Sequence, residues 1–149
     1  MPATQTTSPG TTPALIPATP RRAARLVPAG LAAAAVASAA TTTIAAVGSA
    51  GGISLGVSGA PIPVLGFAVL TALCSVIGLA LALVLARLVR HPRRSFVHVT
   101  VVLTTLSLIP DVAADAAPST KLLLMLTHLV AAAIVVPALA RRLPAGQQH

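Results

Sequence analysis

The basic residues of this 149-residue chain alternate with four apolar runs, and this alternation limits the folds that the chain can adopt. Three arginines precede the first run, four separate the second run from the third, and two follow the fourth. The remaining basic residue, Lys121, lies with Asp111 and Asp115 in the opposite set of connections. Excess basic charge on alternate connections is typical of proteins that cross a membrane several times, with the basic side in the cytoplasm. The nine arginines are Arg21, Arg22, Arg25, Arg87, Arg90, Arg93, Arg94, Arg141 and Arg142.

Composition favours the same class of protein. Hydrophobic residues make up 56% of the chain, charged residues only 8%, and the mean hydropathy is +0.93. Soluble domains carry about 25% charged residues, so a soluble fold of this composition would lack a polar surface. Four runs of about 20 residues, the length that crosses a bilayer, occupy most of the chain. We therefore predict an all-α fold, a four-helix transmembrane bundle with up-down-up-down order.

The chain divides into three predicted parts. Residues 1–25 are rich in Thr and Pro, which indicates a disordered cytoplasmic tail that ends in a basic anchor. Residues 26–142 are expected to form the four-span membrane domain, and residues 143–149 a short cytoplasmic tail. The spans are expected at about 26–47, 64–88, 95–112 and 118–140, with a Gly/Ser-rich outer loop at 48–63.

The first span has two further features. Its arginines, apolar core and Ala37-Ser38-Ala39 imitate a secretory signal with a cleavage site. The apolar run of 22 residues exceeds the usual signal core of about 7–15, so a retained span is the favoured interpretation and cleavage is the alternative. In addition, Gly30, Ala34 and Ser38 are spaced four apart, which lets a neighbouring helix approach closely.

A line of polar residues distinguishes the third and fourth spans. Thr100, Thr104, Ser107 and Asp111 stand at offsets 0, 4, 7 and 11, which places them on one helical face. His128 lies about ten residues into the fourth span, about 15 Å deep at 1.5 Å per residue and so near mid-membrane. We predict a polar seam between these spans with His128 at its centre.

The seam permits two interpretations. An ionisable residue at mid-bilayer indicates a functional site, and His can shuttle a proton or bind a metal near neutral pH. Alternatively, neutral His128 donates one interhelical hydrogen bond, to Thr104 or a carbonyl, and stabilises the bundle by about 0.6–2 kcal/mol. The structural interpretation is favoured, and the functional one stays open.

The sequence carries little that points to catalysis. No Asp or Glu lies in the interior of an apolar run, and Cys74 is the sole cysteine. The chain has no HExxH or Cys/His cluster for zinc, no GxSxG, no P-loop and no dinucleotide fingerprint. Cys74 is expected to be a small buried packing residue. We therefore expect no enzyme activity, no catalytic residue, no metal and no cofactor.

The net charge of +8 has a membrane explanation. In a soluble protein it would suggest nucleic acid, but here the arginines flank apolar runs as orientation anchors. Arginines beside anionic lipid headgroups gain about 1 kcal/mol each. All nine are therefore candidate headgroup anchors. The expected partners are the lipid bilayer and either the protein itself or another membrane protein, without nucleic acid.

Several short segments carry a resemblance to a known family. They are the Pro61-Ile-Pro63-x-x-Gly66-Phe67-Ala68 entry to the second span, the basic second loop, Ser107-Leu-Ile-Pro110, Leu126-Thr-His128-Leu-Val-Ala-Ala, and Pro137 before the final arginines. From about Leu26 to Arg142 the chain resembles a family of small four-span membrane proteins from high-GC bacteria, catalogued as a domain of unknown function. The resemblance implies four helices and cytoplasmic termini, and it brings no activity or site residues.

These observations lead to one functional expectation and one alternative. The first is a non-enzymatic structural or accessory component of the bacterial plasma membrane, multi-pass, with both termini in the cytoplasm. The alternative is a small transporter or proton-coupled permeation subunit that uses His128 and the hydroxyl face of the third span.

The orientation can be tested with reporter fusions. A reporter that is active only in the cytoplasm should work when fused at Arg93 and fail at Gly56, because the basic loop stays inside. Periplasmic activity of the Arg93 fusion would contradict the predicted orientation of the whole bundle.

Overall fold

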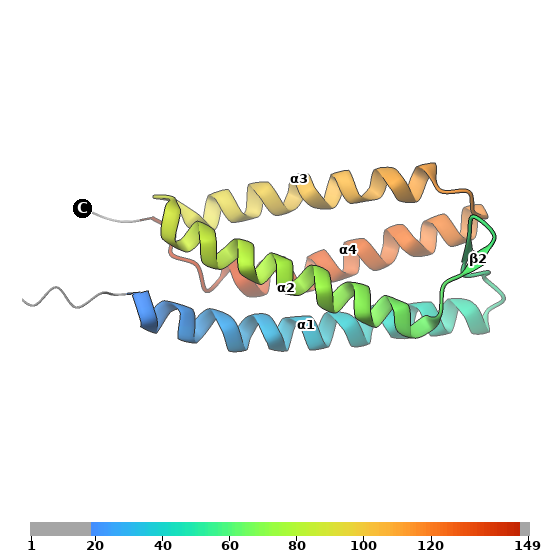
Figure 1. Ribbon diagram of the computed structural model, residues 1–149, viewed down its shortest axis with the longest axis horizontal. Coiled ribbons are helices and arrows are strands. Elements are labelled where there is room, and N and C mark those ends of the chain that lie inside the picture. The colour runs from blue at the N-terminus through green and yellow to red at the C-terminus, as the bar shows by residue number, and fades with distance from the viewer. Residues whose placement is uncertain (1–18, 147–149) are drawn as a thin grey trace, which may run out of the picture.

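The computed structural model describes residues 19–146, with side chains from residue 24, and consists of four long helices and one short hairpin (Figure 1). All four helices are long and apolar enough to cross a membrane, and they pack against one another in an up-down-up-down order. The predicted all-α, four-helix transmembrane bundle is confirmed. The elements are α1 (Thr19–Ala50), β1 (Gly56–Val57), β2 (Ala60–Pro61), α2 (Val64–Leu88), α3 (Pro92–Ala113) and α4 (Pro118–Ala140).

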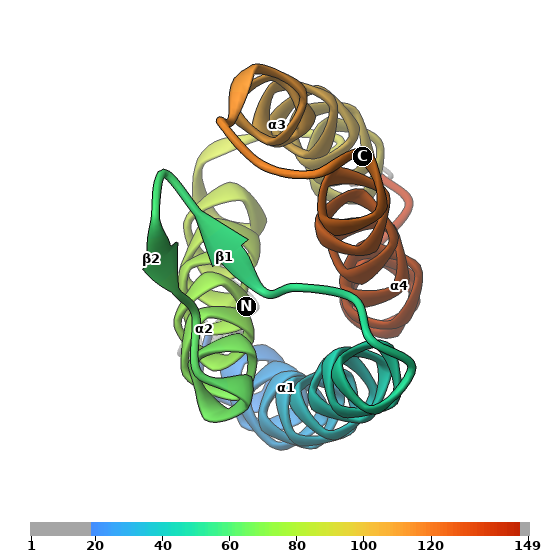
Figure 2. The ribbon, with the colours of Figure 1, turned by 90° about the vertical axis from the view of Figure 1, so that its right-hand side faces the viewer.

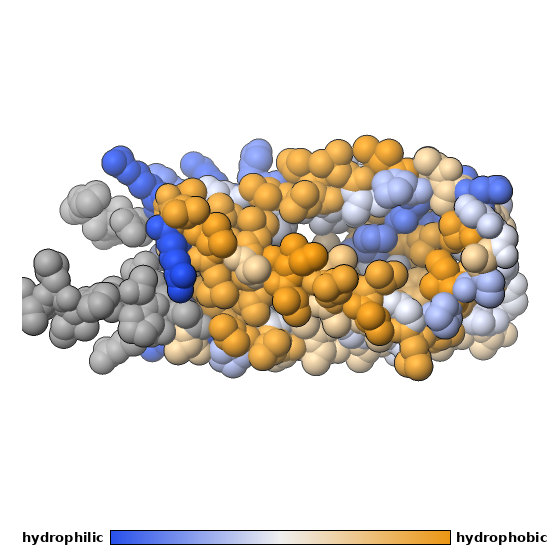
Figure 3. Space-filling view, viewed as in Figure 1, coloured by the Kyte–Doolittle hydropathy of each residue, from blue (hydrophilic) through white to orange (hydrophobic). Residues whose placement is uncertain are grey.

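The two ends of the bundle differ in charge. One end, called here the arginine end, holds the starts of α1 and α3 and the ends of α2 and α4, and Figure 3 shows hydrophilic side chains gathered there. Its described arginines are exposed to the surroundings of the bundle. They are Arg25, Arg87, Arg90, Arg93, Arg94, Arg141 and Arg142. The other end, called the hairpin end, holds the β-hairpin and the 114–117 loop.

Helix α1 begins earlier than the sequence indicated. We expected a disordered tail through residue 25, whereas the helix begins at Thr19 and includes the segment of Arg21, Arg22 and Arg25. Pro20 is tolerated in the first turn because backbone N–H groups there have no intrahelical acceptor, so the N–H that proline lacks costs no hydrogen bond. The Arg and Ala residues that follow are good helix formers. Residues 1–18, the rest of the predicted tail, lie outside the described part of the chain.

Helix α1 also continues past the expected boundary at residue 47, to Ala50. It ends in a Schellman motif, in which the N–H of Gly52 donates to Ser49 O at 3.1 Å and that of Ile53 to Gly48 O at 2.9 Å. Gly52 has φ +85°, a left-handed conformation that favours glycine. The glycine-rich segment is therefore a helix stop in its first part rather than a loop throughout.

The remainder of that segment forms a hairpin that was not predicted. Strands β1 and β2 pair antiparallel around Ser58 and Gly59, which both have positive φ, as a type I′ turn requires. The N–H of Ser58 donates to Asp115 O at 2.8 Å, and Thr120 Oγ1 donates to Ser54 O at 2.5 Å. Figure 2 shows β1 and the segment before it lying across the hairpin end.

Helix α3 is longer than the expected 95–112. It begins at Pro92, so that Arg93 and Arg94 belong to its first turn, and it ends at Ala113. Pro92 suits the first helical position because its φ is already helical. Pro110 lies inside the helix without ending it.

Small residues set how closely α1 approaches its neighbours. A Cβ added to Gly30 would lie 2.8 Å from Leu79 Cδ1 on α2, so the predicted small-residue stripe faces another helix of the same chain. Ser38 Oγ donates to Ala68 O at 3.2 Å, and Thr41 Oγ1 lies 3.0 Å from Thr71 Oγ1. These contacts join α1 to α2 along much of its length.

Two apolar clusters close the bundle at its ends. At the arginine end, Phe96 and Leu139 are fully buried and pack with Leu26. At the hairpin end, Phe67 and Leu123 pack with Ala45. The region between the clusters holds most of the polar side chains discussed below, while large apolar side chains on the outer surface are exposed for contact with lipid.

Two glycines provide a matched test of this packing. A Cβ at Gly48 would lie 2.2 Å from Cδ1 of buried Leu123, whereas a Cβ at Gly78 would meet nothing within 4 Å. Gly48→Ala should destabilise the bundle by about 1–3 kcal/mol through overpacking. Gly78→Ala should be neutral or stabilise by up to about 1 kcal/mol because Ala favours a helix. Thermal unfolding in detergent measures both, and equal effects would contradict the packing of α1 against α4.

Candidate functional site: an intramembrane cavity edged by His128

A cavity of about 270 Å³ lies between α2, α3 and α4, in the region between the two apolar clusters. Figure 3 shows the molecule hollowed between α2 and α3, with hydrophilic side chains inside the hollow. A second cavity of about 110 Å³ adjoins it toward the hairpin end, and His128, Thr71, Cys74 and Ala131 line both. The imidazole of His128 therefore stands where the two cavities meet.

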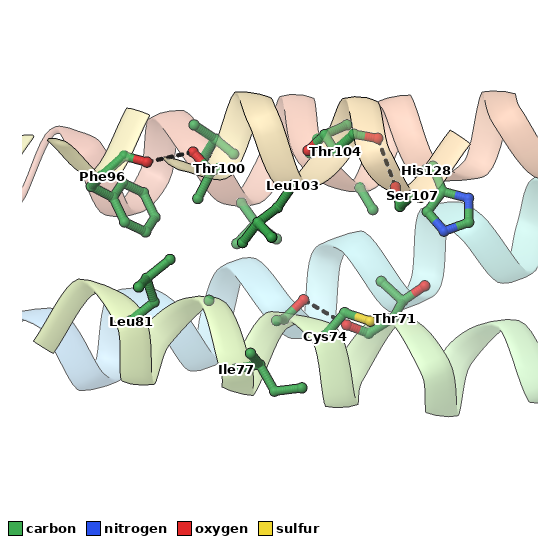
Figure 4. Close-up of a pocket in the computed structure, with 16 residues that line it drawn as sticks. Thr71, Cys74, Ile77, Leu81, Phe96, Thr100, Leu103, Thr104, Ser107 and His128 are labelled. Carbon is green, nitrogen blue, oxygen red and sulfur yellow. Dashed lines mark hydrogen bonds between the residues drawn. The ribbon is translucent and has the colours of Figure 1, made fainter. Parts of the chain in front are cut away.

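The structure brings most of the predicted seam together at this cavity. Thr100, Thr104, Ser107 and His128 all line it, from α3 and α4 respectively (Figure 4). Asp111, the fifth residue of the seam, does not line the cavity and contacts His128 from the other side. Thr100 is buried, and Thr104, Ser107 and His128 are partly exposed.

The contact between His128 and Asp111 joins α3 to α4. Nδ1 of His128 lies 2.9 Å from Asp111 Oδ2 and 3.1 Å from Leu124 O, one turn back on its own helix. Both neighbours accept hydrogen bonds, so Nδ1 carries a hydrogen that points between them. Because this hydrogen is shared between the two oxygens, Asp111 Oδ2 has no well-aligned hydrogen bond within residues 24–146, although it lies only 2.9 Å from Nδ1. The partner of His128 across the helices is Asp111, where we had expected Thr104 or a carbonyl.

Asp111 is more buried than its position near a helix end indicated. Its side chain is 12% exposed, against 40% for His128. In Figure 1, α4 extends farther toward the hairpin end than α3 does, so the last turn of α3 lies beside the interior of α4. A carboxyl group taken out of water needs a partner of opposite charge or hydrogen-bonding capacity, and the imidazole supplies it.

The hydroxyl groups of the seam bond mainly to their own helix. Thr100 Oγ1 donates to Phe96 O at 2.7 Å, and Ser107 Oγ donates to Thr104 O at 2.7 Å (Figure 4). Such bonds satisfy hydroxyl donors inside a membrane. The oxygens keep lone pairs that can still accept a hydrogen bond, but the walls of the cavity are largely apolar.

The remaining charges at the hairpin end do not form a cluster. Nζ of Lys121 donates to Val112 O at 2.9 Å and so joins the start of α4 to the last turn of α3. Asp115 is exposed in the 114–117 loop. Within the described residues no three His, Cys, Asp or Glu side chains lie close enough to hold a metal ion.

One wall of the cavity was missed in the sequence. Helix α2 contributes Thr71, Cys74, Ser75 and Gly78. Cys74 is exposed there, so the expectation that it is buried in packing is wrong. Thr71, Ser75 and Gly78 stand at offsets 0, 4 and 7, which places these small or polar residues on one face of a span otherwise rich in Leu and Val. That pattern, the same as on α3, was the available signal.

Comparison with known proteins places the chain in a family. A model described as a family of unknown function, DUF6069, matches residues 21–145. The chain belongs to this family. The match to DUF6069 covers all four transmembrane helices, the hairpin and the cavity, and it confirms the resemblance to a four-span membrane family of unknown function. No curated protein matches the chain. No solved structure matches it either.

The arrangement has a definite chemical capacity. An imidazole whose Nδ1 is occupied by a carboxylate presents Nε2 to the cavity, and this nitrogen donates a hydrogen bond when the ring is protonated and accepts one when it is neutral. The site can therefore stabilise the bundle, bind a polar group inside the membrane, or exchange a proton with one.

Proposed function

We propose that the protein is a non-enzymatic accessory component of the bacterial plasma membrane, with the arginine end and both termini in the cytoplasm. The supporting observation is that polar side chains within the bundle bond to one another across neighbouring helices. Asp111 and His128 contact each other between α3 and α4. Ser38 and Thr41 likewise bond within the α1–α2 pair. Polar contacts of this kind stabilise a membrane bundle by about 0.6–2 kcal/mol each.

The exposed side chains of the bundle indicate which partners an accessory membrane protein of this kind would bind. The exposed arginines at one end fit anionic headgroups of the inner leaflet, in agreement with the bias of basic residues toward the cytoplasm. The exposed apolar side chains of α2 and α3, such as Leu65, Leu73 and Leu106, fit lipid chains or the helices of another membrane protein or a second copy.

A transport subunit is the second candidate, favoured by one observation. The side chain of His128 is 40% exposed and stands between two cavities, and the hydroxyls of α3 line the larger one. Against it, buried Phe96 and Leu139 close the arginine end of the bundle, so a continuous polar passage would need these side chains to move. The accessory function needs no such movement.

A double-mutant cycle together with a flux measurement separates the two candidates. Asp111→Ala and His128→Ala should each lower the unfolding temperature in detergent, and the two effects should be coupled by about 1 kcal/mol because the residues contact each other. Thr105→Ala is the control, since Thr105 is exposed and donates only to Val101 O on its own helix.

The same variants, reconstituted in vesicles, should leave pH-driven proton flux at the level of empty vesicles, as should the wild-type protein. A flux above that level that is lost in His128→Gln while the unfolding temperature is kept would overturn the accessory function and support transport. Additive effects of the two alanine substitutions on stability would show that the pair does not hold the bundle together.

A further inference from the structure

The larger cavity has a volume and a lining that suit an apolar ligand, called here the guest. An engineered cavity of about 150 Å³ with apolar walls binds benzene, so a cavity of about 270 Å³ takes roughly ten to twelve non-hydrogen atoms. Its walls include Leu81, Leu103 and Val135, and the hydroxyls of Thr100 and Ser107 are turned to their own helix. An apolar body of that size would fill the space while the hydroxyls of Thr100 and Ser107 keep their hydrogen bonds.

The hairpin-end edge of the cavity carries the polar group. Figure 4 shows the imidazole of His128 beside Ser107, with its Nε2 edge turned toward α2. Because Asp111 and Leu124 O occupy Nδ1, Nε2 is the nitrogen available to a guest. A carbonyl oxygen suits Nε2 when the ring is protonated, and a hydroxyl suits it in either state. The guest therefore has one oxygen-bearing head group on an apolar body.

The depth of His128 separates two sources of such a molecule. The residue lies ten positions after the start of α4 at Pro118, about 15 Å along the helix and near the middle of a hydrocarbon layer about 30 Å thick. A phospholipid has its oxygens at the interface and would present only a hydrocarbon chain at this depth. An oxygen at the position of Nε2 belongs instead to a lipophile that dissolves in the bilayer interior.

The route of entry is from the side. The arginine end is closed by the cluster around Phe96, and the hairpin and the segment before β1 lie across the other end (Figure 2). Between α2 and α3 the surface is hollowed (Figure 3), and exposed Ile77 of α2 lies at the cavity. A guest dissolved in the membrane reaches this opening without crossing water.

We propose that the cavity between α2, α3 and α4 binds a lipophile from the bilayer interior, a long-chain alcohol whose hydroxyl bonds Nε2 of His128. This binding site is independent of the accessory function proposed above, because neither the Asp111–His128 contact nor the packing of the bundle depends on a guest.

Cys74 makes the site measurable, because it is the sole cysteine and lines the cavity. The rate at which N-ethylmaleimide labels the full chain in detergent is measured with added 1-decanol or decane. 1-Decanol should slow labelling at concentrations about threefold to tenfold lower than decane, since one hydrogen bond adds to the same apolar contact. A phospholipid added at the same concentration in the micelles as decane should slow the labelling of Cys74 no more than decane does.

Variants assign the effect to the cavity and to His128. Gly78→Leu and Ala132→Leu place a side chain in the cavity and should remove the effect of every probe, whereas Ala80→Leu, on the exposed face of α2, should leave it unchanged. His128→Leu should keep the effect of decane, which also shows that the variant is folded, and lose the preference for 1-decanol. In Cys74→Ala/Ala80→Cys, whose thiol faces away from the cavity, labelling should not respond to the probes.

The contradicting results are equally definite. Labelling of the wild-type chain that does not change at saturating 1-decanol would show that the cavity takes no such guest. An equal effect of decane and 1-decanol would remove the role of His128 in recognition. An effect of phospholipid as large as that of 1-decanol would make a bilayer phospholipid the occupant. A response of the thiol at position 80 would show that the probes act by changing how N-ethylmaleimide partitions into the micelle.

Discussion

The hydrocarbon interior of a membrane offers no water to polar atoms, and this constraint shapes every level of the structure. It requires helices, because a helix satisfies its backbone internally. It also directs side chains to partners within the chain: Ser38 to Ala68 O, Thr41 to Thr71, and Asp111 to His128. The family match over residues 21–145 covers the residues that make these contacts.

The long-range pattern of apolar runs and arginines predicted the architecture. The start of α1 and the hairpin were missed because they depend on short local segments. Four apolar runs with arginines on alternate connections were enough for the number and order of the helices. The exact start of α1 was missed, since a Pro/Thr-rich composition says little about whether Thr19 and Pro20 can begin a helix. The hairpin was missed because Ser58 and Gly59 form a two-residue turn between strands of only two residues each.

The sequence predicted which residues of α3 share a face, but not which residue of α4 each of them meets. Periodicity placed Thr100, Thr104 and Ser107 on one face, and the structure brings them to one cavity with His128. Periodicity within a helix does not give the axial offset between two helices, so it could not pair Asp111 with His128. Nor does it reveal an empty volume: the cavity exists because apolar clusters fill both ends of the bundle, while Gly78 has no side chain to fill its middle.

The state of the imidazole of His128 is the point on which the account depends, because both the stability of the α3–α4 pair and the polarity of the cavity follow from it. Solid-state ¹⁵N NMR of the protein in lipid bilayers, with the His128 signals assigned through His128→Gln, measures it directly. We expect Nδ1 to carry a hydrogen and its chemical shift to move in Asp111→Ala, since Oδ2 lies 2.9 Å away. A neutral ring with its hydrogen on Nε2, or an Nδ1 signal unaffected by Asp111→Ala, would contradict the account.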